Sequence, residues 1–181
     1  TVDDAVLSDP YTGLFWPQRL ERAEVVTLEG LPMTKTLDWV DLSFTTQIDV
    51  PADAWADWNA ATQQFIPVSE KFPDGATALT KITLYYPEEL WNVKWHDGST
   101  MSVGDFVNSI IRQFDRAKPE SPIYDEASVP NYESLMTYFK GVKLVTTNPL
   151  GIETYVDTYD LDAEVLIGQN PFGTWFPINR T

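Results

Sequence analysis

The chain has 181 residues and carries 12 Lys and Arg against 27 Asp and Glu, a formal net charge of −15 with a pI near 4.2. Such a field repels nucleic acid and anionic lipid head groups, so we expect no nucleic-acid partner. Hydrophobic residues make up 43% of the chain, which excludes a disordered protein. The absence of Cys excludes disulfides, thiolate nucleophiles and Cys-ligated zinc.

The N-terminal third is predicted to be extended before it forms strands. Residues 1–20 contain turn dipeptides such as Asp9-Pro10 and predict an extended arm, whose Leu14, Phe15 and Trp16 should dock on another surface. Residues 23–28 predict a short strand. Residues 39–50 alternate between apolar and polar side chains and predict a half-buried strand. Residues 51–58 are compatible with the start of a helix.

The centre of the chain predicts a strand, a turn and a helix in succession. Residues 78–86 alternate in polarity and end at a proline, as a strand does. The dipeptide Asp97-Gly98 is typical of a turn. Ser102 stands where a helix N-cap belongs, and Asp105 follows three residues later, close to the capping-box pattern. From Val103 to Phe114 the apolar residues recur every three or four positions, which predicts a helix with one buried face.

The C-terminal third predicts a second helix and a hairpin. Residues 118–130 contain three prolines and predict an ordered loop, and residues 131–139 suit a short helix. Residues 142–146 and 151–156 predict a β-hairpin. Residues 165–167 are expected to add a strand, and residues 169–181 form an apolar tail.

The only histidine, His96, precedes Asp97, which invites a hydrolase interpretation based on a His–Asp pair. Adjacent side chains rarely point the same way, so we favour a turn with a structural His96. One histidine also excludes a His-pair metal site. The chain has neither a nucleophile elbow nor a glycine-rich phosphate loop. We therefore expect no catalytic residue, no metal and no cofactor.

Two further patterns have competing interpretations. The carboxylates near residues 157–164 are suitable oxygen ligands for calcium, but their spacing differs from an EF-hand loop, and we favour a solvated acidic turn. These carboxylates belong to Asp157, Asp160, Asp162 and Glu164. The seven Trp and eight Tyr are compatible with a carbohydrate-binding platform, although aromatic residues at this density more often form a core.

Residues 94–107 resemble the W-H-D-G-(S/T) signature of extracellular solute-binding proteins of family 5, the peptide-, oligopeptide- and nickel-binding components of ABC importers. The matching residues are Trp95, His96, Asp97, Gly98, Ser102 and Asp105. Residues 139–142 are similar to the f-x-G-V entry to a strand pair in that family. Residues 51–58 are similar to its P-x-L-A-x-x-W segment, which precedes a hairpin, so the resemblance favours pairing of residues 54–58 with 64–69. The resemblance is clearest over residues 51–164.

The resemblance implies an α+β accessory domain of a periplasmic-binding-protein-like II receptor, with a twisted, mainly antiparallel sheet packed against at least two helices. Family members are far longer than this chain. We therefore expect a single excised domain, with an arm over residues 1–20, a core over residues 21–168 and a tail over residues 169–181 that leads to a missing lobe. The chain has no signal peptide and no initiator Met, which an excised fragment or a processed mature protein would each explain.

The resemblance also implies the function of the parent protein. It would capture peptides or similar small solutes in the periplasm or on the outer face of the membrane, where such receptors include lipoproteins, and deliver them to an ABC permease. The segment from Ser121 to Tyr124 is similar to an S-P-Y segment whose Tyr approaches bound peptide, although Ile123 here stands before Tyr124. The alternatives are a carbohydrate-binding β-module and a hydrolase that uses His96 and Asp97.

Overall fold

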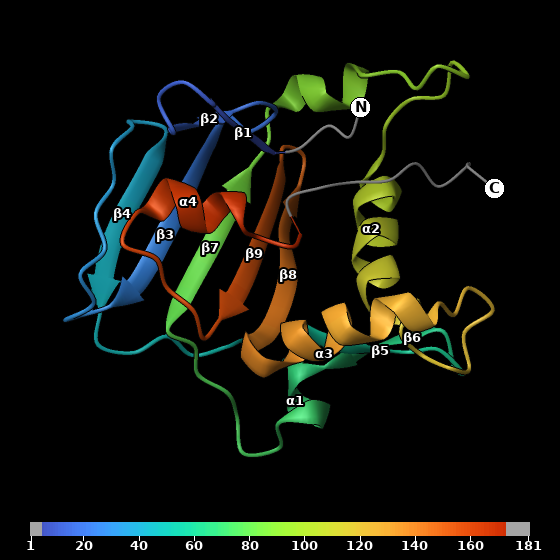
Figure 1. Cartoon of the computed structure of the whole chain (residues 1–181). Coiled ribbons are helices and arrows are strands. Elements are labelled where there is room, and N and C mark those ends of the chain that lie inside the picture. Colours follow the sequence, from blue (N-terminus) through green and yellow to red (C-terminus); the bar gives the residue numbers. More distant parts are fainter. Residues whose placement is uncertain (1–4, 173–181) are drawn as a thin grey trace.

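The computed structural model describes residues 5–172, and its main feature is a twisted sheet with helices packed against it (Figure 1). The strands of this sheet are β3 (Arg22–Leu28), β4 (Val40–Thr45), β5 (Trp55–Asn59), β6 (Gln64–Pro67), β7 (Thr80–Tyr85), β8 (Phe139–Thr147) and β9 (Leu150–Val156). Within residues 5–172 their order is β4-β3-β7-β9-β8-β5-β6. The β3–β4 pair is parallel, and the other pairs of these described strands are antiparallel.

The helices are α1 (Val68–Lys71), α2 (Val103–Asp115), α3 (Val129–Tyr138) and α4 (Ala163–Gly168), with 3₁₀ turns η1 (Glu88–Asn92) and η2 (Glu126–Ser128). In Figure 1, α4 crosses the sheet over β3 and β7, while α2 and α3 lie beside β8 and β5. This is the predicted α+β fold with helices against a mainly antiparallel sheet. None of the helices in the described part of the chain has the length and hydrophobicity of a membrane span.

The predicted start and buried face of α2 are confirmed. The Asp105 carboxylate accepts hydrogen bonds from the Ser102 N–H at 2.7 Å and from the Ser102 hydroxyl at 3.2 Å, within a capping box. Phe106, Ile110 and Phe114 are buried at the helical spacing that the sequence shows. This face therefore joins α2 to the main hydrophobic core.

Both predicted hairpins are confirmed, as β5–β6 and β8–β9. At the first of them, the Asn59 side-chain oxygen accepts hydrogen bonds from the N–H groups of Ala61 and Thr62, each at 3.0 Å. This side chain supplies the turn acceptor, as Asn commonly does. The alternative of a helix over residues 51–58 is therefore wrong.

The predicted strand over residues 39–50 is shorter in the structure, where β4 ends at Thr45. β4 is an edge strand, and Phe44 on it is 47% exposed, so the apolar residues do not form one buried face. Beyond Thr45 the chain leaves β3, and the Val50 N–H donates to the carbonyl of Ala76 instead. Alternation alone does not reveal where an edge strand loses its partner.

The predicted strand over residues 165–167 is wrong, because these residues lie in α4. The Asp162 carboxylate accepts a hydrogen bond from the Val165 N–H at 3.1 Å and so caps the helix. A run of three apolar residues fits a buried strand and a buried helical turn equally well. The cap and the packing of α4 decide between them.

The predicted N-terminal arm forms an antiparallel ribbon of β1 (Val6–Ser8) and β2 (Phe15–Pro17). Phe15 docks as expected, close against Gly168 of α4, whereas Trp16 is 47% exposed. At the other end, Phe172 is buried in the core. The rest of the predicted tail, residues 173–181, lies outside the described residues.

Candidate functional site

The segment from Trp95 to Ser99 forms a tight turn, as predicted. The Trp95 N–H donates to the Ser99 carbonyl at 2.8 Å, and the Gly98 N–H donates to the Trp95 carbonyl at 2.9 Å. Gly98 has a φ of +87°, a conformation that glycine adopts without strain. The Asp97 carboxylate accepts hydrogen bonds from the Ser99 hydroxyl at 2.6 Å and the Ser99 N–H at 2.8 Å, which lower the pKa of Asp97. His96 is exposed on this turn rather than placed in a cleft.

The strand predicted over residues 78–86 is β7, and next to the turn an isolated bridge joins Lys94 and Thr100. η1 separates this bridge from β7, so the turn is not an extension of the sheet. The Trp95 side chain is half-buried and packs against the main core. The signature residues therefore form one structural corner: Trp95 anchors it, Asp97 and Gly98 shape the turn, and Ser102 with Asp105 starts α2.

The structure does not bring Tyr124 to this corner. Tyr124 follows the C-terminal end of α2, whereas the corner precedes its N-terminal end, and thirteen helical residues span about 20 Å. The Tyr124 side chain is 43% exposed, and its N–H donates to the Ser121 carbonyl at 3.2 Å. A role for Tyr124 in ligand binding stays a prediction.

The acidic residues near the C-terminus form hydrogen bonds and ion pairs with other segments of the chain and do not converge on a cation site. The buried Glu164 accepts a hydrogen bond from the Thr36 N–H at 2.8 Å, and Asp157 pairs with Lys140 at 2.8 Å. Because Glu164 is buried, the predicted solvated acidic turn is wrong at this residue. In the described part of the chain, no group of three or more His, Asp or Glu residues is placed to hold a metal ion.

Most of the described Trp side chains belong to the core or pack on it. Trp58 is buried, and Trp55 stacks on Phe65 with ring centroids 4.0 Å apart. Those of Trp39, Trp91 and Trp95 are half-buried against the core. The core interpretation is therefore confirmed for these residues, and the structure gives no support for a flat aromatic platform built from them.

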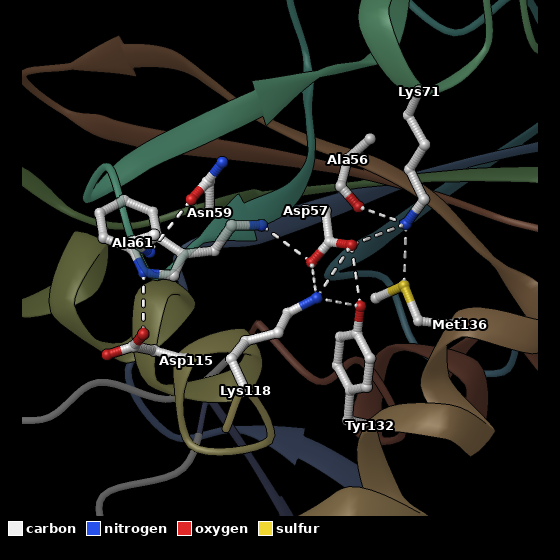
Figure 2. Close-up of polar contacts among 10 residues, drawn as sticks. Ala56, Asp57, Asn59, Ala61, Lys71, Asp115, Lys118, Tyr132 and Met136 are labelled. Carbon is white, nitrogen blue, oxygen red and sulfur yellow. Dashed lines mark hydrogen bonds and ion pairs between the residues drawn. The ribbon is translucent and has the colours of Figure 1, made fainter. Parts of the chain in front are cut away.

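A buried charged network that the sequence analysis missed is centred on Asp57 of β5, which is only 7% exposed (Figure 2). The ammonium groups of Lys71 and Lys118 lie 3.3 Å and 3.1 Å from its carboxylate oxygens. The Tyr132 hydroxyl donates to Oδ2 at 2.8 Å, and the Trp58 N–H donates to Oδ1 at 2.8 Å. One carboxylate thus joins β5, the end of α1, the segment after α2, and α3.

The network keeps Asp57 ionised although it is buried. Burial acts to raise the pKa of Asp57, but the Trp58 N–H, Lys71, Tyr132 and Lys118 together outweigh it and lower the pKa below its usual value. Two effects raise the pKa of Tyr132: burial is the larger, and the hydrogen bond that the hydroxyl donates to Asp57 is the smaller. The phenol therefore stays protonated and remains a hydrogen-bond donor. We conclude that the cluster around Asp57 has a structural role, which is to connect β5 with α1, α3 and the segment after α2.

Sequence reasoning missed this network because its members are far apart in the chain. The three side chains that contact the Asp57 carboxylate are 14, 61 and 75 residues away. One signal was present in the sequence: Asp57 lies between the apolar residues Ala56 and Trp58 in a predicted strand. The structure buries all three residues. An acidic residue in such a position requires a buried partner.

No protein-family model matches this chain, and no curated protein is significantly similar to it in sequence. The resemblance to solute-binding proteins of family 5 therefore depends on the motif residues described above.

Proposed function

We propose that this chain is the accessory domain of an extracytoplasmic solute-binding protein that captures peptides or similar small solutes for an ABC importer. The observation that carries the proposal is the corner between Trp95 and Asp105. Its residues match the family signature, and the structure gives a reason for the identity of four of them. Gly98 has a positive φ, Asp97 accepts the hydrogen bonds of the turn, and Ser102 and Asp105 form the helix cap.

The α+β architecture supports the same proposal, because the resemblance implies a mainly antiparallel sheet packed against helices. Receptors of this class enclose their solute between two lobes that close about a hinge. An accessory domain by itself contains neither of the two lobes that enclose the solute. We therefore expect the chain to have little affinity for the transported solute, and we assign it a structural role with no catalytic activity.

Calorimetry on two proteins tests the proposal. The 181-residue chain, titrated with a panel of short peptides, should give dissociation constants weaker than about 0.1 mM. The product of the full reading frame that contains this chain should bind at least one of these peptides in the micromolar range, and it should associate with an ABC permease in membrane extracts. A panel of oligosaccharides serves as the control for the carbohydrate-binding alternative.

Two results would contradict the proposal in different ways. Micromolar peptide binding by the 181-residue chain would show that it is a complete binding unit rather than an accessory domain. Binding of oligosaccharides but not of peptides or other small solutes by the longer product would overturn the family assignment itself.

A further inference from the structure

The buried network around Asp57 contains one contact that its structural role does not explain. The Lys71 ammonium donates to the Ala56 carbonyl at 3.2 Å, to Asp57 Oδ2 at 3.3 Å and to the thioether Sδ of Met136 at 3.0 Å (Figure 2). An ammonium has three N–H donors, so these three acceptors match it in number. A thioether is a weak acceptor, however, and here it faces a charged donor.

The fold holds Met136 and Lys71 together. Met136 lies four residues after Tyr132 on α3, so both side chains lie on the same face of the helix and reach the network. Lys71 is the last residue of α1, and its ammonium lies 3.3 Å from the Asp57 carboxylate. The charged donor is therefore held beside the sulfur by a contact that does not depend on the sulfur.

The three methionines of the chain differ in their access to solvent. Met33 and Met101 are buried, and each is 4% exposed, whereas Met136 is half-buried. A small oxidant in water must reach a methionine sulfur before it can oxidise it, so exposed methionines react first. By this criterion Met136 is the most reactive methionine of the chain.

The position of Lys71 changes what oxidation of Met136 does to the fold. A sulfoxide is polar, so at most half-buried positions it lacks a partner and destabilises its surroundings. At Met136 the new oxygen is bonded to the sulfur that the Lys71 ammonium already contacts. A sulfoxide oxygen is a stronger acceptor than a thioether, and a hydrogen bond from an ammonium is charge-assisted. The polar group that oxidation creates thus has a donor beside it.

We propose that Met136 is a site of oxidation by peroxides and that Lys71 stabilises its sulfoxide. In the reaction the sulfur gives two electrons to the peroxide, and the O–O bond breaks. One oxygen becomes bonded to the sulfur, and the other takes up its proton and leaves as water. Hydrogen peroxide therefore yields one sulfoxide and one water, and methionine sulfoxide reductases reverse the change. This proposal does not rest on the proposed function.

Peptide mass spectrometry of the 181-residue chain after timed exposure to hydrogen peroxide tests the site. Met136 should gain one oxygen at least about tenfold faster than Met33 and Met101, because they are buried. The measurement uses the wild-type protein, and the two buried methionines are its internal controls. Oxidation of either of them as fast as Met136 would overturn the proposed site.

Melting temperatures before and after peroxide treatment test the role of Lys71. In the wild type the sulfoxide should lower the Tm by less than about 2 °C, whereas in Lys71→Leu, which lacks the donor, it should lower the Tm by roughly 4–8 °C. Lys143→Leu is the matched control, because it removes one positive charge from an ion pair with Asp53 and leaves Lys71 in place. It should respond to peroxide as the wild type does. A response of Lys71→Leu no larger than that of this control would overturn the role of Lys71.

A second pair of variants gives an answer even if Lys71→Leu does not fold. Met136→Gln carries an amide oxygen that can accept the hydrogen bond from Lys71, whereas Met136→Leu has no acceptor. Without any peroxide, Met136→Gln should therefore melt at a higher temperature than Met136→Leu. The reverse order would show that Lys71 does not stabilise an oxygen acceptor at this position and would overturn its role.

Discussion

Substitution of Asp57 by Asn tests whether the buried network stabilises the fold. The change keeps the size and the acceptor for the Tyr132 hydroxyl but leaves the ammonium groups of Lys71 and Lys118 without their shared counter-charge. Removing one member of a fully buried ion pair costs about 3–5 kcal/mol, whereas an exposed pair is worth about 0–1 kcal/mol. The two lysine side chains are 27% and 21% exposed and can turn toward water. We therefore expect a loss of about 2–3 kcal/mol.

Urea denaturation followed by tryptophan fluorescence measures this loss, which in a chain of this size lowers the melting temperature by roughly 5–10 °C. The pH dependence gives a second readout. The pKa of Asp57 is lowered on folding from an ordinary value of 3.8, so its stabilisation is present above that value and is lost as the pH falls through the folded pKa. The difference between wild type and Asp57→Asn should therefore be full at pH 7 and shrink below about pH 4.

Asp53→Asn is the matched control, because Asp53 pairs with Lys143 at 2.7 Å but its side chain is 71% exposed. Its effect on stability should be much smaller than that of Asp57→Asn. If Asp57→Asn at pH 7 is no less stable than this control, or if its deficit persists unchanged at pH 3, the ionised carboxylate does not stabilise the junction between β5 and the helices.

Three further predictions concern backbone geometry, capping and packing. Gly98→Ala forces a side chain into the left-handed region and should cost about 1–2 kcal/mol in urea denaturation, and an unchanged midpoint would contradict the turn geometry. Ser102→Ala should lower the free energy of unfolding by about 1 kcal/mol. Asp105→Ala should lower it more, because the Asp105 carboxylate accepts both hydrogen bonds from Ser102, and the reverse order would contradict the cap. Gly168→Ala places a Cβ 2.6 Å from Phe15 and should cost about 1–3 kcal/mol and speed proteolysis of β1 and β2. Wild-type protease resistance would show that the ribbon is not held at this contact.

The parts of the structure that the sequence predicted well are those stabilised by near neighbours. The start of α2 depends on two residues three positions apart, and its buried face depends on a spacing of three and four. The β8–β9 hairpin pairs strands that follow each other directly in the chain. Interactions of this range leave a periodic pattern in the sequence, so the pattern predicts them.

The wrong predictions concern segments whose structure depends on residues that are distant in the sequence. Residues 165–167 lie in a helix because α4 packs against β4 and the N-terminal ribbon, which are more than 100 residues away in the sequence. The strand expected over residues 39–50 ended at Thr45 because β4 lies at the sheet edge. The candidate site divides in the same way: the turn at Asp97 and Gly98 was predicted, whereas the network around Asp57 was not.

The sequence by itself determined the turn before α2, the cap and buried face of that helix and the β8–β9 hairpin, whereas the β5–β6 hairpin and the α+β class were expected from the family resemblance. Only the tertiary structure decided that β9 lies between β7 and β8 and that one carboxylate holds two lysines and a tyrosine. The physical reason is the range of the interactions. Local hydrogen bonds and side-chain periodicity are set by residues a few positions apart, while burial and charge pairing depend on which distant segments the folded chain brings together.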